Sequence, residues 1–316
     1  EQHTASAFAG QGGKVLYIDE VHKYQDWSRE VKMIYDYLPE LKVVVTGSSI
    51  MEIVKGTDAD LSRRTITYTM EGLSFREYLN MTSGTDIKPY SLDEILAGNA
   101  VLPADIRHPL MHFREYLILG YFPFAKQDDY LTRLENVINH TMEIDIPAFA
   151  RMNISTSRKL KQLLEVISKS VPFKPNFSEI GRAISTDRST VADYMVYMEK
   201  SGLIRQLHTA GNGMAVIEKT EKVYLGNTNF IYALSDGAPN MGNVRETFFM
   251  SALSVSHSMT SSPVADFIVD GHTFEIGGKG KTGKQIQGTD DAFIVKDDIE
   301  YAYMNIIPLW AFGLNY

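Results

Sequence analysis

Residues 14–24 of the chain, KVLYIDEVHKY, place four apolar residues directly before two carboxylates, Asp19 and Glu20. The run from Val15 to Ile18 is typical of a β-strand buried in a sheet. Ionised carboxylates are almost never buried unless another group compensates their charge. The stretch therefore predicts a buried strand whose end faces a compensating ion or ligand, and the nature of that compensator indicates the function.

The composition is that of an ordinary globular protein, with 316 residues of which 44% are hydrophobic and 22% charged. No apolar run approaches the roughly 18 residues that cross a bilayer, and no signal peptide is visible, so we expect a cytoplasmic protein without membrane contact. The absence of cysteine excludes disulfide scaffolds, thiolate zinc sites and cysteine nucleophiles. The net charge of −8 argues against attraction of nucleic acid by the whole molecule, although a single domain can still be basic.

Apolar runs alternate with an amphipathic stretch up to about Asn80, in the order KVLYID, DWSREVKMIYDYL, LKVVVTGSS and RRTITYTM. Uniformly apolar strands separated by helices indicate an α/β fold with a parallel sheet covered on both faces. Helical patterns such as SLDEILAG and RKLKQLLEVISKS then replace the strands. We expect four segments: a parallel-sheet core at 1–80, a helical lid or bundle at 81–170, a compact domain of helices and a hairpin at 171–238, and a second α/β domain at 239–316.

Asp19 and Glu20 are expected at the carboxyl end of a parallel strand, where ligands collect in open sheets. Four apolar residues followed by Asp-Glu form the Walker B pattern, in which Asp holds Mg²⁺ and Glu polarises the attacking water. The alternative is a strand end whose acids cap the next helix. The next strand ends in TGSS, which places Thr46, Ser48 and Ser49 where a polar residue can orient water beside a γ-phosphate; small hydroxyl residues are also common in turns.

Two adjacent arginines, Arg63 and Arg64, precede the third apolar run. An arginine at this point can reach the nucleotide of a neighbouring subunit and stabilise the charge of the transition state. This role would require a homo-oligomer. The alternative is a solvated basic edge of the sheet.

With these residues in this order, the chain resembles the AAA+ ATPases of bacteria and archaea that carry a C-terminal nuclease-like domain. The resembling stretches extend over essentially the whole chain: VLYIDEVHKYQDWSREVKMIYD, LKVVVTGSS, LSRR with GLSFREYL, GYFPF and EIGGKGKTGKQI. The resemblance implies a partial P-loop NTPase core that uses ATP and Mg²⁺. In that core Asp19 and Glu20 match Walker B, with Asp19 as the metal ligand; Ser48 lies in the sensor segment, and Arg63 or Arg64 is the arginine finger.

A phosphate-binding loop of the form G-x-x-x-x-G-K-[S/T] does not precede the Walker B strand. The GQGGK sequence at Gly10–Lys14 leads into a strand instead of a helix, and GKGKTGK at Gly278–Lys284 is followed by Gln285 and belongs to another domain. In the family that the chain resembles, this loop lies upstream. The resemblance therefore implies a shortened chain, which we expect to bind ATP poorly by itself.

The stretch FSEIGRAISTDRSTVADYMVYMEKSGLIRQL predicts two short helices and a strand, the order of a winged-helix domain. Ser178 is expected to cap the first helix and Asp187 or Ser189 the second, which ends at Gly202. The apolar positions expected to face the core are Val191, Tyr194, Met195 and Met198.

The second helix of a winged-helix domain would place its leading residues, Arg188, Ser189 and Thr190, in the major groove of DNA. Between Arg158 and Lys222 there are 11 Lys or Arg residues against 7 Asp or Glu, which favours DNA as a partner. The alternative is a winged helix that contacts protein or separates two domains.

The stretch ADFIVDGHTFEI predicts a hairpin that turns at Asp270-Gly271. If this dipeptide forms the turn, Asp266 lies opposite Glu275, with Cβ atoms about 4.5–5.5 Å apart, and a cation would relieve their repulsion. This is the acidic pair of a PD-(D/E)XK nuclease, in which both residues hold Mg²⁺. Glu246, on a preceding helix, is the candidate for a third oxygen ligand.

The nuclease-like pattern expects a lysine two residues after Glu275, where this chain has Gly277. The first lysine is Lys279, and the two glycines before it allow a bulge that brings it back. The alternative is a nuclease-like fold without cleavage, whose acids are relieved by lysines instead of metal. Three lysines, Lys279, Lys281 and Lys284, form a basic strip that can touch a nucleic-acid backbone or simply be solvated.

Three functions follow from these patterns. The first is an AAA+-type ATPase whose ATP hydrolysis is coupled to a DNA-associated activity through the winged-helix and nuclease-like domains. The second is a non-catalytic DNA-binding regulator or scaffold. The third is a metal-dependent nuclease that acts through the C-terminal domain.

Overall fold

The computed structural model of the chain describes residues 2–21, 24, 26–47, 61, 63–150, 152, 154–210, 220–235 and 237–316. The chain divides into two compact units. The first comprises residues 1–70 and 143–154, and the second comprises residues 71–142 and 155–316. The four-segment division expected from the sequence remains a prediction.

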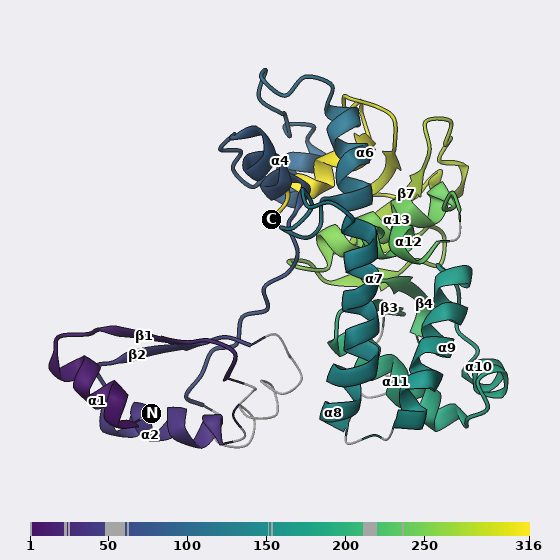
Figure 1. Ribbon diagram of the computed structural model, residues 1–316. Helices are drawn as coiled ribbons and strands as arrows, with labels where there is room; N and C mark the ends of the chain where they lie inside the picture. The colour runs from purple at the N-terminus through teal and green to yellow at the C-terminus, as the bar shows by residue number, and fades with distance from the viewer. Residues whose placement is uncertain are drawn as a thin grey trace. The chain divides into compact units, whose positions relative to one another are not determined.

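The first unit is built on two parallel strands, β1 (Val15–Ile18) and β2 (Lys42–Val45). Helices α1 (Gln2–Gly10) and α2 (Trp27–Tyr37) lie along the same face of this strand pair (Figure 1). The parallel pairing and the helix between the two strands confirm the α/β pattern expected from the sequence.

Successive side chains of a strand point to opposite faces of the sheet. On one face Ile18 and Val43 pack against the helices in a core that includes the buried Trp27. On the other face the side chains of Tyr17, which is 72% exposed, and Val44 are open to solvent. The expected cover on both faces is therefore wrong for the described residues, because α1 and α2 pack on the same side.

The alternating segment RRTITYTM forms no strand, although its pattern predicts one. Ile66, Tyr68 and Met70, which the alternation would place on one face, are all exposed. A strand exists only where a neighbouring strand accepts its backbone hydrogen bonds. The described residues provide no such neighbour for this segment.

The second unit begins with helices whose starts follow directly from the sequence. Ser74 and Glu77, and likewise Ser91 and Glu94, form complete capping boxes at the first two helices. The helices of this stretch are α4 (Phe75–Ser83), α5 (Leu92–Leu96), α6 (Pro109–Leu119), α7 (Tyr130–His140) and α9 (Ile154–Ser170). Between α7 and α9 the chain passes through residues 143–154 of the first unit, which contain most of the π-helical turn η2 (Thr141–Asp145) and all of α8 (Ile146–Ala150). None of the described helices is both long enough and apolar enough to span a bilayer.

Two helices and an antiparallel hairpin follow, as the sequence predicts: α10 (Phe177–Ala183), α11 (Arg188–Lys200), β3 (Ile204–His208) and β4 (Thr220–Leu225). The four apolar positions expected to face the core of α11 are buried. Asp187 caps α11, and the helix stops before Gly202, which has a left-handed backbone.

The cap expected for α10 is wrong. Asn176, not Ser178, caps this helix, because its side-chain oxygen accepts hydrogen bonds from the backbone N–H groups of Ser178 and Glu179. Asn and Ser are about equally good caps, so residue type alone does not decide between neighbouring positions.

The rest of the second unit is a five-stranded sheet preceded by helices. The strands occur in chain order across the sheet; the first three are antiparallel, and β7, β8 and β9 are parallel. The elements are α12 (Thr228–Leu234), α13 (Met241–Leu253), β5 (Met259–Ser261), β6 (Phe267–Val269), β7 (His272–Gly277), η4 (Lys284–Ile286), β8 (Ala292–Lys296), β9 (Ile306–Pro308) and η5 (Leu309–Leu314).

Helix α13 covers one face of this sheet, as Figure 1 shows for α13 and β7. Phe249 of α13 has ring contacts with Phe267, Phe274 and Phe312, at centroid distances of 5.2, 5.2 and 4.9 Å. Large aromatic side chains bury much apolar area, so this cluster supplies a major part of the core under the sheet.

The hairpin of β6 and β7 has the predicted register. Val269 pairs with His272 across Asp270-Gly271, and both turn residues have positive φ, as the type I′ turn requires. The regular pairing ends at Phe267 and Phe274. The backbone N–H of Asp266, the residue before β6, donates to the same Phe274 carbonyl at 3.1 Å, so the position of Asp266 opposite Glu275 remains a prediction.

Candidate functional site

The carboxyl ends of β1 and β2 bring two oxygen-bearing side chains together. The hydroxyl of Thr46, the first residue after β2, donates a hydrogen bond to the carboxylate of Asp19, the first residue after β1. Two backbone bonds fix this position: the N–H of Thr46 donates to Ile18 at 2.9 Å, and the N–H of Val21 donates to Thr46 at 3.0 Å. Parallel pairing thus places the two strand ends side by side.

Glu20 follows Asp19 at a sharp turn of the chain. Its φ of 51° lies in the left-handed region, which is uncommon for a residue other than glycine. Its backbone N–H donates to the Asp19 carboxylate at 2.9 Å. The turn stabilises the orientation of Asp19 at the sheet edge.

The hydroxyl that lies beside Asp19 is that of Thr46. The sequence pointed to Ser48 as well as Thr46, and Ser48 and Ser49 lie outside the described residues. Among the described residues, the site at this sheet edge therefore comprises Asp19, Glu20 and Thr46.

The two arginine candidates differ in their surroundings. The Nε of Arg64 lies 3.2 Å from the carboxylate of Asp36 on α2, and its guanidinium lies 5.9 Å from the ring centre of Tyr35. Arg64 is thus bound to a helix of its own unit. Arg63 has a φ of 72° and is exposed.

Oxygen ligands at an exposed strand end fit Mg²⁺, which prefers carboxylate oxygens and keeps several waters or phosphate oxygens around it. Asp19 and Thr46 are both exposed, so water and a phosphate can reach them. The donor set therefore fits a Mg²⁺ ion held by Asp19.

A second acidic site lies in the other unit, around the hairpin of β6 and β7. The Nζ of Lys222, on β4, lies 3.1 Å from a carboxylate oxygen of Glu246 on α13 and 3.3 Å from one of Asp266. The hydroxyl of Tyr224 donates to Glu246 at 3.0 Å. Two of the predicted acids are therefore bound by a lysine and a tyrosine of the preceding hairpin.

The third acid, Glu275, is 1% exposed and forms an ion pair with Lys281. The predicted lysine, Lys279, is exposed, and the structure shows no ion pair between it and Glu275. Gly277 explains why Lys281 instead of Lys279 binds Glu275. The Lys281 side chain passes over Gly277 so closely that a Cβ added there would come within 2.7 Å of it. The loop thus folds back across Gly277 and places a later lysine over the acid.

Burial raises the pKa of Glu246 and of Glu275, and the charge of Asp266 adds to both effects. Burial alone would lower the pKa of Lys222, but the charges of Glu246 and Asp266 outweigh it, so that this pKa is raised. The lysine therefore stays charged and compensates both carboxylates.

The predicted metal ligands Asp266 and Glu275 do not fit a metal ion in this arrangement. Ammonium groups already bind all three acids, and the described residues contain no group of three acidic or histidine side chains placed to hold a metal. In the observed arrangement, lysine ammonium groups compensate the charges of all three acids.

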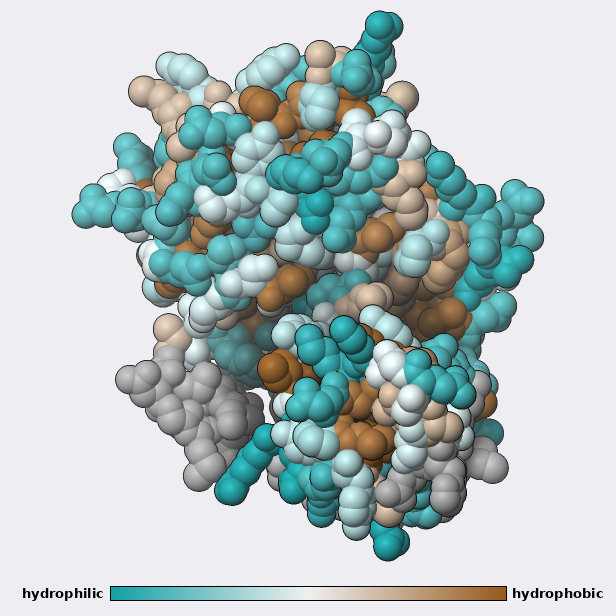
Figure 2. All heavy atoms as spheres, turned by 90° about the vertical axis from the view of Figure 1, so that its left-hand side faces the viewer, coloured by the Kyte–Doolittle hydropathy of each residue, from teal (hydrophilic) through white to brown (hydrophobic). Residues whose placement is uncertain are grey.

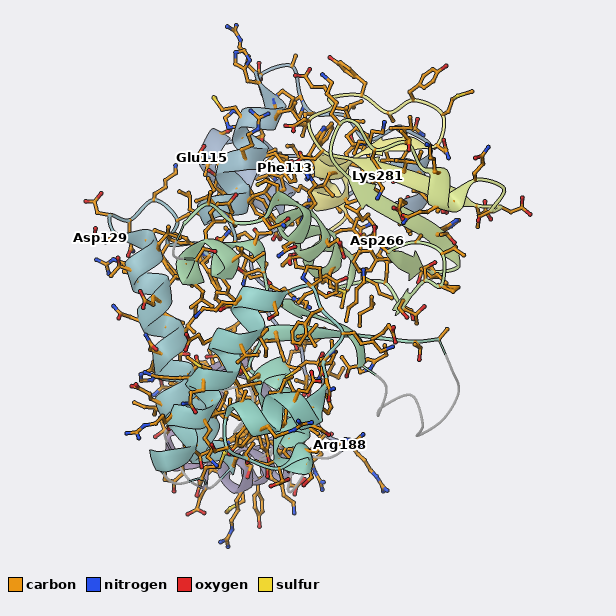
Figure 3. The ribbon with its side chains drawn as sticks, turned by 90° about the vertical axis from the view of Figure 1, so that its right-hand side faces the viewer. Phe113, Glu115, Asp129, Arg188, Asp266 and Lys281 are labelled. Atoms are coloured by element: carbon orange, nitrogen blue, oxygen red, sulfur yellow. The ribbon has the colours of Figure 1, made fainter. Side chains whose placement is uncertain are left out.

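The leading end of α11 is occupied by its own cap. The hydroxyls of Ser189 and Thr190 donate to the Asp187 carboxylate at 2.5 and 2.7 Å, and these bonds hold the pKa of Asp187 well below its usual range. Arg188 is exposed, and Figure 3 shows it far from Asp266 and Lys281. Two of the three residues predicted to contact DNA thus stabilise the helix.

Two family models match parts of the chain. Residues 1–79 match the family model of an AAA domain, and residues 110–240 match a domain of unknown function (DUF8612). The first match supports an AAA-like, P-loop ATPase type of fold for the part of the chain that contains Asp19, Glu20 and Thr46.

Two archaeal proteins are similar to longer parts of the chain. The uncharacterized protein MJ1637 of Methanocaldococcus jannaschii is 22% identical over 218 residues, which are 66% of this chain and 46% of the relative. The chain thus spans less than half of that relative's length. The solved structure of the Walker-type ATPase PABY2304 of Pyrococcus abyssi matches 73% of this chain and 65% of its own, with 12% identity and a TM-score of 0.37.

Proposed function

We propose that the protein hydrolyses ATP at the carboxyl ends of β1 and β2. The observation that supports this proposal is the contact between Asp19 and Thr46 at adjacent ends of two parallel strands, within a segment that matches an AAA domain. In open α/β sheets, ligands bind at such strand ends.

In this proposal Asp19 holds Mg²⁺, Glu20 polarises the attacking water and Thr46 orients the Asp19 carboxylate. Mg²⁺ supplies the positive charge that neutralises the phosphate oxygens. A phosphate-binding loop between a strand and a helix does not occur in residues 1–316, so the proposal requires that other residues supply it. Arg63 is the finger candidate for an adjoining subunit, because Arg64 is bound to Asp36.

The test measures Mg²⁺-dependent phosphate release from ATP by the product of the complete reading frame, beside the 316-residue chain. We expect Glu20→Gln to lower the rate by at least about 100-fold, since loss of the group that activates water removes general-base catalysis. The control is Glu40→Gln, which alters an exposed glutamate of the same unit and should leave the rate unchanged. Turnover that persists in Glu20→Gln would refute the assignment.

We propose a DNA-associated role for the second unit as a second function. The support is the arrangement of α9, α10, α11 and the β3–β4 hairpin, with Phe173 bridging to Val223 as a short third strand. This order is that of a winged-helix domain. Arg188 remains the candidate phosphate contact at the leading end of α11.

The test is binding of a short DNA duplex at several salt concentrations, followed by fluorescence anisotropy. If Arg188 contacts a phosphate, Arg188→Gln should weaken binding and reduce the slope of log K against log salt by about 1. Arg107→Gln, which removes another exposed arginine of the same unit, is the matched control. Equal slopes for the two variants would favour a winged helix that contacts protein.

We propose that residues 239–316 form a nuclease-like domain that does not cleave DNA. The support is the lysine bound to each of its three acids. Supercoiled plasmid incubated with the protein and Mn²⁺ should remain intact. Nicking that is lost in Glu275→Gln but kept in Glu300→Gln, an exposed glutamate of the same domain, would overturn this proposal.

A further inference from the structure

An apolar pocket of about 410 Å³ lies in the second unit, between two segments that are distant in the sequence. One wall is the connection from α5 to α6, and the other is formed by residues 300–311. Gly98 and Ala302 close one end, since a Cβ added at Gly98 would lie 3.2 Å from that of Ala302. Because Gly98 has no side chain, the two walls approach each other closely at this end of the pocket.

The floor of the pocket is buried and apolar. Trp310 and Ile95 contribute to it, and the indole N–H of Trp310 donates to the carbonyl of Ile299 at 3.2 Å. The indole N–H therefore has a hydrogen-bond partner, and the apolar part of the Trp310 ring lines the pocket. An apolar floor without unsatisfied polar atoms suits a hydrophobic side chain of a ligand.

The rim of the pocket exposes large side chains. Val101 is 62% exposed and Tyr301 is 81% exposed, and the neighbouring Tyr303 and Met304 are also exposed. Hydrophobic side chains reach the surface at several places on the face of the molecule that Figure 2 shows. Tyrosine and methionine are enriched in protein interfaces, where their apolar parts pack against a partner.

The pocket continues as a groove. A second hollow of about 440 Å³ shares the ridge of Val101, Leu102 and Pro103 and extends along residues 86–90. The hydroxyl of Tyr90 donates to the carbonyl of Val101 at 3.1 Å and holds the ridge in place. A groove that runs past one deep pocket fits an extended or helical segment better than a compact ligand.

The charge around the groove is acidic. The two segments that form its walls, residues 86–109 and 300–311, contain five acidic and two basic residues. Glu94 and Glu300 line the hollows themselves. A basic partner would complement this rim, whereas an acidic partner would be repelled.

We propose that this groove binds a segment of another protein that inserts an apolar side chain into the pocket over Trp310 and carries lysine or arginine residues that face Glu94 and Glu300. The apolar anchor supplies most of the binding energy, and the basic residues set the choice of partner.

The test uses two fluorescein-labelled 15-residue peptides, an amphipathic helix of leucine and lysine and its counterpart of leucine and glutamate. Binding to the full chain is measured by anisotropy. We expect the lysine peptide to bind and the glutamate peptide not to bind. Val101→Asp should weaken binding at least about tenfold, because it places a charge where the apolar side chain enters.

The control is Val137→Asp on α7, where the replaced valine is also exposed (46%) and does not line the groove. Nonspecific attraction of a basic peptide would increase equally in both variants, since both add one negative charge. Equal affinities for the two variants would therefore overturn the proposal. Tyr301→Ser, at a more exposed position, provides a second variant that carries little risk to folding.

Binding of an apolar dye that Val101→Asp abolishes, without binding of either peptide, would also overturn the proposal. That result would assign the groove to a small molecule.

Discussion

The molecule contains two sites with closely spaced acids, and they differ in burial and in partner. Asp19, at the end of β1, is exposed and accepts a hydrogen bond from the hydroxyl of Thr46. Glu246 and Glu275, around the C-terminal hairpin, are largely buried and are bound by lysines. The comparison shows that burial, and not the acid residues themselves, decides which group compensates the charge.

The physical reason is the free energy of solvation. An exposed carboxylate keeps its water and can exchange it for an ion or a phosphate-bound metal. A carboxylate removed from water needs a permanent partner, because an uncompensated charge in the interior costs several kcal/mol. The first site therefore lies at the solvent-exposed surface, and the acids of the second site are held by ion pairs with lysines.

Removal of Lys222 should have the largest effect, because it leaves Glu246 and Asp266 without their cation. A fully buried ion pair that loses one partner costs about 3–5 kcal/mol. Because these side chains are 18–29% exposed, we expect Lys222→Met to lower the free energy of unfolding by less, about 2–4 kcal/mol. Urea unfolding followed by circular dichroism measures this change.

The matched control for that change is Lys88→Met, which removes an exposed lysine paired with Asp86. Surface pairs contribute about 0–1 kcal/mol. If both variants lost the same stability, the contrast between a buried and an exposed site would be refuted. Addition of Glu246→Gln to Lys222→Met should restore part of the stability, because one of the two unpaired charges is gone.

Substitution of Gly277 tests why Lys281 reaches Glu275. The methyl group of Gly277→Ala would overlap the Lys281 side chain, so the loop must shift and weaken the ion pair. We expect a loss of about 1–3 kcal/mol, typical of overpacking. Gly280→Ala, in the same loop with nothing within 4 Å of the added group, should change stability little. Differential scanning calorimetry of both variants distinguishes overlap from loss of glycine flexibility.

The pH dependence of stability should differ in sign between buried and exposed carboxylates. Folding raises the pKa of Glu246 above its ordinary value of 4.5, chiefly through burial. The folded state then holds the proton of Glu246 more tightly than the unfolded state does. The contribution of Glu246 to stability is therefore fully present below its ordinary pKa and is lost as the pH rises through the raised pKa. Lys222 remains charged throughout this range.

Asp270 provides the opposite case, because the hydrogen bond from His257 lowers its pKa below 3.8. Its contribution to stability is present above the ordinary pKa and is lost as the pH falls through the lowered one. The free energy of unfolding is measured from pH 3 to pH 8 for two variants. Glu246→Gln should lose the fall in stability with rising pH, and Asp270→Asn should lose the fall in stability with decreasing pH. A Glu246→Gln profile parallel to that of the parent protein would contradict the assigned cause.

Substitutions at the exposed strand end should have the smallest effect on stability. We expect Asp19→Asn and Thr46→Val to change the free energy of unfolding by less than about 1 kcal/mol, because both side chains lie in water. Isothermal calorimetry with Mg²⁺ and ATP on the complete reading frame should nevertheless show weaker binding by Asp19→Asn. A large loss of stability would mean that Asp19 has a structural role.

Several elements of the fold are readable from short stretches of sequence. The strand before Asp19, the capping boxes at Ser74 and Ser91, and the turn at Asp270-Gly271 each depend on residues within a few positions of one another. Such local interactions leave a pattern in the sequence, because the same residues form the element and stabilise it. The register that pairs Val269 with His272 and Phe267 with Phe274 follows from the turn alone.

Other features depend on which distant segments meet. The segment with Ile66 and Tyr68 has the alternation of a strand but lacks a neighbour among the described residues. The cap of α10 is local, but it falls on Asn176 instead of Ser178, because residue type alone does not decide between two nearby capping residues. The pairing of Glu246 with Lys222 joins two elements whose contact no local pattern predicts.

By itself, the sequence determined the strand with Asp19 at its end, the capping boxes at Ser74 and Ser91 and the hairpin turn at Asp270-Gly271, because these arise from interactions between near neighbours along the chain. Only the tertiary structure decided that Thr46 lies beside Asp19, that Lys281 rather than Lys279 binds Glu275, and that Lys222 compensates Glu246. Those contacts depend on how distant segments fold onto one another, and burial then determines which charges require a partner.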